Sequence, residues 1–128
     1  MAKVLSKLKI YPDLILSSTA VRAYEFAKIL ADEFGIKEKK IITTRDLYLA
    51  DENEMLKTVR EIDDKYKIVF LVSHNPGITY FANSLCICNI DNIPTSGVVG
   101  IKFDVSGWKE IKNGKGEFEI FEYPKKYY

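Results

Sequence analysis

At 128 residues, with 19 basic and 18 acidic side chains, the chain is long enough for one domain with a core and carries a net charge of +1. A composition of 47% hydrophobic and 29% charged residues excludes a disordered tail and a strongly basic nucleic-acid-binding domain. No apolar stretch approaches the ~20 residues that cross a bilayer, and the first residues lack the apolar core of a signal peptide. We therefore expect one cytoplasmic domain over residues 1–128, without a nucleic-acid or membrane partner.

The first half of the chain alternates short apolar strands with amphipathic helices. Helices are expected over 3–9, 19–34 and 52–66, and strands over 13–17 and 40–43. In the second of these helices, small and apolar residues recur at spacings of three and four. Ser17 and Ser18 are candidate N-caps for it, and Gly35 is a natural stop.

The second half begins with the most apolar strand of the chain, expected over 68–73. We expect this strand at the centre of the sheet, buried on both faces. A helix over 76–85 follows, with Asn75 as its N-cap and Pro76 as its first residue. Two further strands, over 97–105 and 117–123, are expected to pair antiparallel. The order of elements predicts an α/β fold, a three-layer α/β/α sandwich with a mostly parallel sheet and an antiparallel edge.

The two cysteines, Cys86 and Cys88, form a C-x-C motif. On a strand their Cα atoms would lie about 6.5–7 Å apart, at the outer limit for a disulfide. We therefore expect two free thiols. With a single histidine in the chain, they also fall short of the about four ligands of a structural zinc site.

Two strand-to-helix junctions carry the candidate functional residues, His74 at one and Arg22 at the other. Ligands of open α/β sheets bind beyond the carboxyl ends of the strands, and histidine suits proton and phosphoryl transfer near neutral pH. A cation in the first turn of a helix is unfavourable by about 0.3–1 kcal/mol, unless an anion lies between it and the free N–H groups. The two residues thus predict an anion pocket. The alternatives are a histidine that only caps a turn, and an arginine paired with Glu25 on the surface.

Several segments resemble, in their order, bacterial phosphohistidine phosphatases of the SixA type, which belong to the histidine phosphatase superfamily with the phosphoglycerate mutases. The most specific motifs are S-S-x-A-x-R-A at residues 17–23 and S-H-N-P-G at residues 73–77. The resemblance extends over essentially the whole chain and also includes residues 12–16, 47–48, 72, 94–98 and 123–125.

The resemblance implies a phosphoglycerate mutase-like fold and phosphoryl hydrolysis through a phosphohistidine intermediate. His74 matches the second histidine of the family, and Arg22 matches a phosphate clamp. Ser18 and Asn75, beside them in the same motifs, are expected at the phosphate as well. No metal or other cofactor is implied, since arginines and imidazoles neutralise the charge. The substrate would be a phosphorylated histidine of a protein, or a small phosphoester.

One feature of the family is not found: its nucleophilic histidine lies in an Arg-His motif at the end of the first strand, and this sequence contains no Arg-His pair. We expect the first strand of the family to be missing here, and little or no turnover from these residues alone. Three explanations stay open: a truncated phosphatase, a phosphate- or phosphohistidine-binding pseudoenzyme, and a structural or interaction module. In the third explanation, the absence of this strand would leave an apolar sheet edge exposed, which could pair with a second copy or with a partner.

Overall fold

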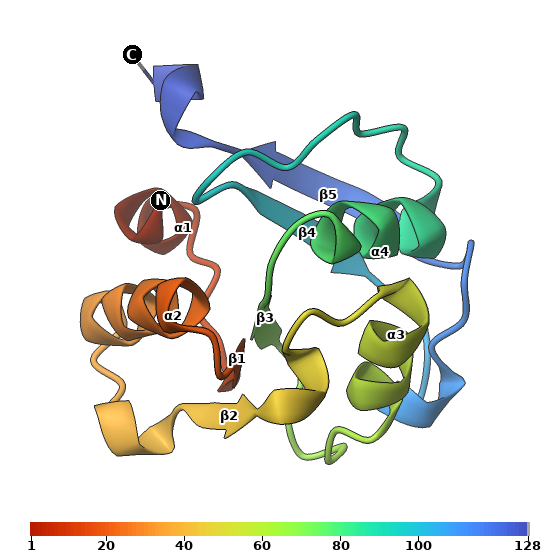
Figure 1. Ribbon diagram of the computed structural model, residues 1–128, viewed down its shortest axis with the longest axis horizontal. Helices are drawn as coiled ribbons and strands as arrows, with labels where there is room; N and C mark the ends of the chain where they lie inside the picture. The colour runs from red at the N-terminus through yellow and green to blue at the C-terminus, as the bar shows by residue number, and fades with distance from the viewer. Residues whose placement is uncertain (128) are drawn as a thin grey trace.

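A computed structural model describes residues 1–127 and arranges them as helices packed on both faces of a central sheet (Figure 1). The helices are α1 (Ala2–Lys7), α2 (Val21–Glu33), α3 (Glu52–Arg60) and α4 (Gly77–Cys86). The strands are β1 (Leu14–Ser18), β2 (Ile42–Thr44), β3 (Val69–Val72), β4 (Val98–Lys102) and β5 (Glu117–Glu122). Short 3-10 helices cover Glu38–Lys40, Arg45–Leu47, Trp108–Glu110 and Pro124–Tyr127.

The central sheet is parallel and has the strand order β2-β1-β3. All five residues of β1 are buried, whereas Val72 is the only buried residue of β3. The expectation that the most apolar strand lies at the centre is therefore wrong: β1 takes that place, and β3 is an edge strand. An apolar run shows that a strand is covered on its faces, but it carries no information on which neighbours its backbone pairs with.

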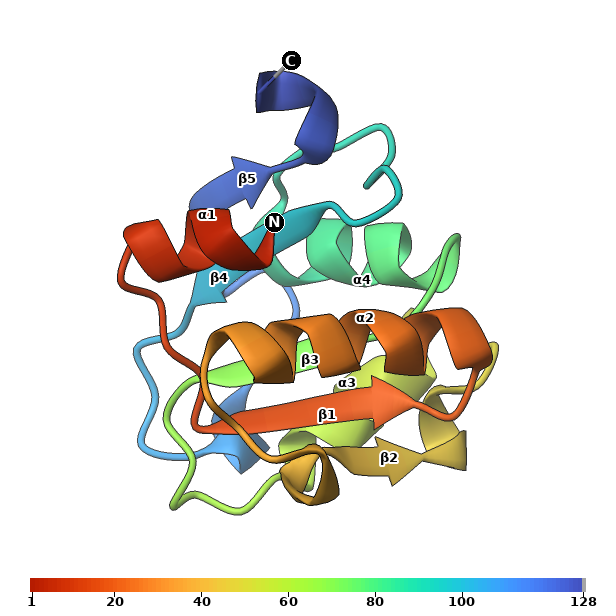
Figure 2. The same cartoon turned by 90° about the vertical axis from the view of Figure 1, so that its left-hand side faces the viewer.

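The two C-terminal strands pair antiparallel, as expected, with a register shift between Gly100 and Ile101. They form a separate two-stranded sheet instead of an edge of the parallel one. In both views β4 lies between β5 and β3 (Figures 1 and 2). Within residues 1–127, no backbone ladder joins β3 to β4.

Two apolar cores flank the parallel sheet and make the three layers. Figure 2 shows α2 in front of the sheet and α3 behind it. The first core joins α1 and α2 to β1. Helix α2 contributes small side chains that let it approach the sheet closely, including Ala23, Ala27 and Ala31. The second core, around Leu47 and Met55, joins α3 and α4 to the opposite face. The three-layer prediction is thus confirmed.

Helix α3 ends at Arg60, six residues before the expected end at residue 66. It begins at Glu52, as expected, and the structure shows a capping box between Asp51 and Glu54. Its end is set by aspartates that bond to backbone outside the helix. The carboxylate of Asp63 accepts from Lys65 N at 2.9 Å and that of Asp64 from Trp108 N at 2.9 Å, and such side-chain acceptors compete with helical hydrogen bonds.

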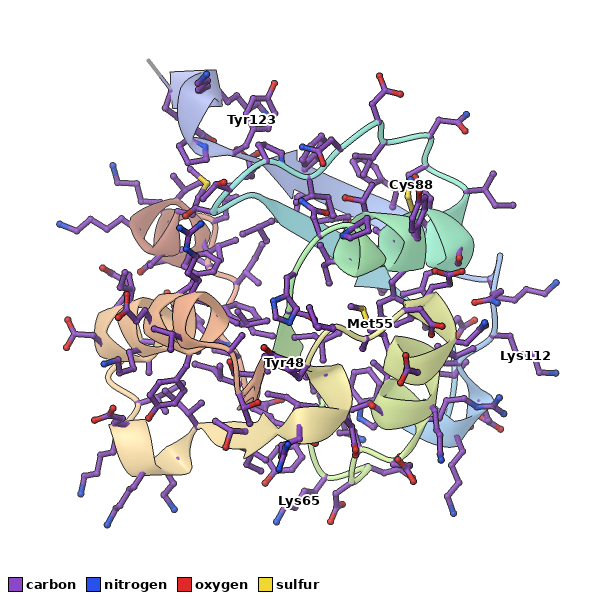
Figure 3. The ribbon with its side chains drawn as sticks, in the orientation of Figure 1. Tyr48, Met55, Lys65, Cys88, Lys112 and Tyr123 are labelled. Carbon is purple, nitrogen blue, oxygen red and sulfur yellow. A yellow bond between two sulfur atoms is a disulfide. The ribbon has the colours of Figure 1, made fainter. Side chains whose placement is uncertain are left out.

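The C-x-C motif is closed by a disulfide between Cys86 and Cys88, and the expectation of free thiols is wrong (Figure 3). The motif does not lie on a strand: Cys86 is the last residue of α4, and Ile87 adopts the left-handed conformation with φ 50° and ψ 54°. This turn brings the two Cα atoms to 5.3 Å, within the usual range for a disulfide.

Candidate anion-binding site

The two junctions that carry His74 and Arg22 meet at one edge of the sheet. Strands β1 and β3 run parallel, with Ser17 opposite Val72, so their carboxyl ends coincide. Helix α2 starts three residues after β1, and α4 starts five residues after β3. The topology therefore confirms that both motifs lie where α/β sheets bind ligands.

His74 is half-buried and is held from two sides through Nε2. The Oγ atom of Ser18 lies 3.2 Å from Nε2, and the backbone N–H of Leu49 donates to Nε2 at 3.3 Å. The ring of Tyr48 packs against the imidazole at 6.0 Å between centroids, and Figure 3 shows this tyrosine close to β3. Because Ser18 ends β1, these contacts bring the S-S-x-A-x-R-A and S-H-N-P-G motifs together.

Ser18 supports His74 from inside the protein. The residue is fully buried, and its Oγ atom accepts the backbone N–H of Ala20 at 3.2 Å. Ser18 does not cap α2 as expected, because the N-cap residue is Ala20, which has no side-chain cap. The N-terminus of α2 thus keeps N–H groups without a side-chain acceptor.

Arg22 is the second residue of α2 and is exposed. Within residues 1–127 its guanidinium forms no ion pair, so the alternative pairing with Glu25 is absent from the structure. The first turn of α2 contains no acidic residue, in contrast to α3, whose first turn carries Glu52 and Glu54. Arg22 and the free N–H groups therefore give this helix end a positive character.

Asn75 binds within the protein through both ends of its amide. Its Nδ2 donates to Ile93 O at 2.7 Å, and its Oδ1 accepts from Thr79 Oγ1 at 2.5 Å. The expected N-cap role is wrong, because Pro76 occupies the N-cap position and α4 begins at Gly77. The side chain instead ties the loop at Ile93 to the first turn of α4.

Residues 47–50 contact the junction after β3, and although the resemblance includes residues 47–48, no role was expected for this segment. Ser73 Oγ donates to Leu47 O at 3.2 Å, and the backbone of Ala50 lies against Gly77 so closely that a Cβ there would collide with Ala50 O. The glycine of the S-H-N-P-G motif could have indicated a close approach of this kind. No signal in the sequence pointed to the amide of Leu49.

The described residues contain no group of three or more histidine, cysteine or acidic side chains placed to hold a metal ion. In the same part of the chain, no helix is long and apolar enough to cross a membrane.

Comparisons with known proteins point to one fold. No family model matches the sequence. The uncharacterized protein ML1117 of Mycobacterium leprae (strain TN) is 30% identical over 121 residues, covering 87% of this chain and 71% of that protein.

Three solved structures are similar over almost the whole chain. The putative phosphohistidine phosphatase SixA from Nakamurella multipartitia has a TM-score of 0.79 at 16% identity, over 96% of this chain and 77% of its own. The putative phosphohistidine phosphatase SixA from Agrobacterium tumefaciens has a TM-score of 0.78 at 23% identity, over 96% of this chain and 75% of its own. The protein histidine phosphatase SixA complexed with tungstate has a TM-score of 0.75 at 19% identity, over 94% of this chain and 74% of its own.

Proposed function

Since the chain belongs to the family of the Mycobacterium leprae protein ML1117 and has the fold of the SixA phosphatases, we propose that it binds a phosphoryl group beside His74 and Arg22. The observation that carries the proposal is the contact between Ser18 and His74, which joins the two motifs at the carboxyl edge of the sheet. The ligand is a phosphorylated histidine of a protein or a small phosphoester.

The two ligand-contacting residues have complementary roles. Arg22 supplies a permanent charge and a planar pair of donors suited to phosphate oxygens. His74 supplies an imidazole donor. Ser18 and Asn75 act on the ligand indirectly, because Ser18 is buried behind His74 and both amide ends of Asn75 bind protein groups. We assign these two residues positioning roles.

Turnover by these residues alone is expected to be very low. Covalent hydrolysis through a phosphohistidine needs one imidazole as nucleophile, and His74 is the only histidine of the 128 residues. If His74 contacts the transferring phosphoryl group, no second imidazole of this sequence accepts it. The proposed activity of the chain is therefore binding without efficient hydrolysis, as in a pseudoenzyme.

Titration with tungstate and with orthophosphate, followed by calorimetry, tests the binding proposal. Loss of a charge-assisted phosphate contact costs about 1.5–3 kcal/mol, so Arg22→Ala should weaken binding by about 10-fold or more. Lys28→Ala is the matched control, since it removes one positive charge from an exposed position of the same helix, about two turns further from its N-terminus. Equal affinities for the wild type and Arg22→Ala would refute the proposal.

A phosphohistidine peptide provides the test of turnover. We expect no phosphate release above the background rate in its presence. Robust release that disappears in His74→Ala would show that this chain carries out the hydrolysis by another route, and it would overturn the assignment of binding alone.

A second candidate function is strand pairing through the unpaired edge of β3, which faces β4, with a second copy of this chain as the partner. Val69, Phe70 and Leu71 are apolar and only half-buried. The strand carries no charge and the net charge of the chain is +1, so two copies meet little electrostatic repulsion there. Light scattering over a concentration series should reveal association. On dilution, the backbone amide of Leu71 should exchange its hydrogen with solvent faster than that of Leu16. A monodisperse, cooperatively unfolding monomer would exclude this function.

A further inference from the structure

The hydrogen bonds of His74 define which of its ring nitrogens carries the proton. Leu49 N donates to Nε2, and a backbone N–H group can only be a donor. Ser18 Oγ already accepts from Ala20 N, so its hydroxyl hydrogen is free to point at the same nitrogen. Nε2 therefore presents its lone pair to the Leu49 amide, and the Ser18 hydroxyl can donate to the same nitrogen.

A neutral imidazole has one donor and one acceptor nitrogen, so an acceptor at Nε2 places the hydrogen on Nδ1. Within residues 1–127 Nδ1 has no hydrogen-bond partner, and it is not among buried unpaired atoms. The donor of His74 is thus open to solvent, while the acceptor is occupied by the protein.

The segment that supplies the Leu49 amide is held in place at both ends. Leu47 and Ala50 are buried at 0% and 5% exposure, and the contacts with Ser73 and Gly77 fix their carbonyl groups. Leu49 itself has φ 54°, which a leucine rarely adopts, although its side chain is 74% exposed. Side-chain packing therefore does not explain this conformation. Its structural result is an amide directed at His74.

We propose that residues 47–50 are a positioning segment that holds His74 in the Nδ1–H tautomer and so makes Nδ1 the atom that donates to a bound phosphoryl group. Only the assignment of Nδ1 as the donor to a phosphoryl group rests on the proposed function; the tautomer does not. Gly77 supports the positioning segment, because any larger residue would displace Ala50 and with it the Leu49 amide. Ser73 supports the same segment through its hydrogen bond to Leu47 O.

The tautomer is measured directly by long-range ¹H–¹⁵N correlation of the imidazole at about pH 8, above the range in which histidine usually titrates. Because His74 is the only histidine, its signals need no assignment against others. We expect a protonated Nδ1 and an unprotonated Nε2 in the wild type. In Ser73→Ala and Gly77→Ala we expect a shift toward a mixture of both tautomers.

Two comparisons separate positioning from general destabilisation. Gly35→Ala strains a left-handed residue (φ 67°) with open space around it and outside the site, so it should lower stability and leave the tautomer unchanged. Leu49→Gly keeps the amide and should also retain the wild-type tautomer. A wild-type spectrum with the proton on Nε2, or equal spectra for the wild type, Ser73→Ala and Gly77→Ala, would overturn the proposal.

Addition of orthophosphate distinguishes the tautomer from the proposed function. Binding with a change confined to the Nδ1 resonance supports both statements. No response to phosphate in a chain with the Nδ1–H tautomer would refute the phosphoryl-binding function and leave the positioning role established. A response at Nε2, with loss of the Leu49 contact, would overturn Nδ1 as the contacting atom.

Discussion

Leu47 and Leu49 lie two residues apart and allow the same substitution to be compared in opposite environments. Leu47 is fully buried beside Met55 and Ile111, both of which are at most 1% exposed. Leu→Ala changes in cores cost about 2–5 kcal/mol, and the cost is highest where the surroundings cannot collapse. The bond from Ser73 to Leu47 O limits such collapse, so we expect Leu47→Ala to cost about 3–4 kcal/mol.

Leu49→Ala should cost far less. About a quarter of this residue is covered, and full burial of a leucine contributes about 2 kcal/mol, so the expected loss is about 0.5 kcal/mol or less. Urea denaturation followed by circular dichroism gives both free energies of unfolding, with unchanged m-values if the transitions stay two-state. Similar losses for the two variants, or a loss below about 1 kcal/mol for Leu47→Ala, would refute the account of how residues 47–50 are anchored.

Three further predictions concern contacts outside the site. Asp51→Ala removes the cap of α3 and should lower the free energy of unfolding by about 1 kcal/mol, whereas Asp51→Asn should retain most of it. Asp13 accepts two backbone N–H groups at the start of β3, so Asp13→Ala should cost about 1–3 kcal/mol by urea denaturation. The hydroxyl of Tyr127, followed by Lys126, lowers the pKa of Glu122 below the ordinary 4.5. The stabilisation from Glu122 is therefore complete above pH 4.5 and lost as the pH falls through the lowered value. The difference in melting temperature between the wild type and Glu122→Gln should shrink over that window and not near neutral pH.

The site shows that the place of a short motif in the fold can be predicted from the sequence, whereas its hydrogen-bond partners cannot. His74 and Arg22 were identified from their places at strand-to-helix junctions, and parallel pairing of β1 and β3 brings those junctions to one edge. Ser18 and Asn75 were expected at the ligand. In the structure, Ser18 lies within hydrogen-bond distance of His74, and Asn75 binds Ile93 and Thr79, because small polar side chains at junctions satisfy nearby backbone and side-chain groups.

The sequence by itself determined the kinds of elements and their order. The hydrophobic period and the stop at Gly35 act within a few residues, so they can be read locally. It also shows that the 128 residues contain a single histidine, a count that follows from composition alone.

Tertiary structure decided what depends on partners far apart in the chain. It placed β1 instead of β3 at the centre of the sheet, separated the β4–β5 pair, and directed the amide of Leu49 to a histidine 25 residues away. Strand order and tautomer both depend on which backbone groups meet across the fold, and residue types do not encode backbone pairing. His74 is therefore predictable as a candidate site residue, while its contacts with Ser18 and Leu49 follow only from the folded chain.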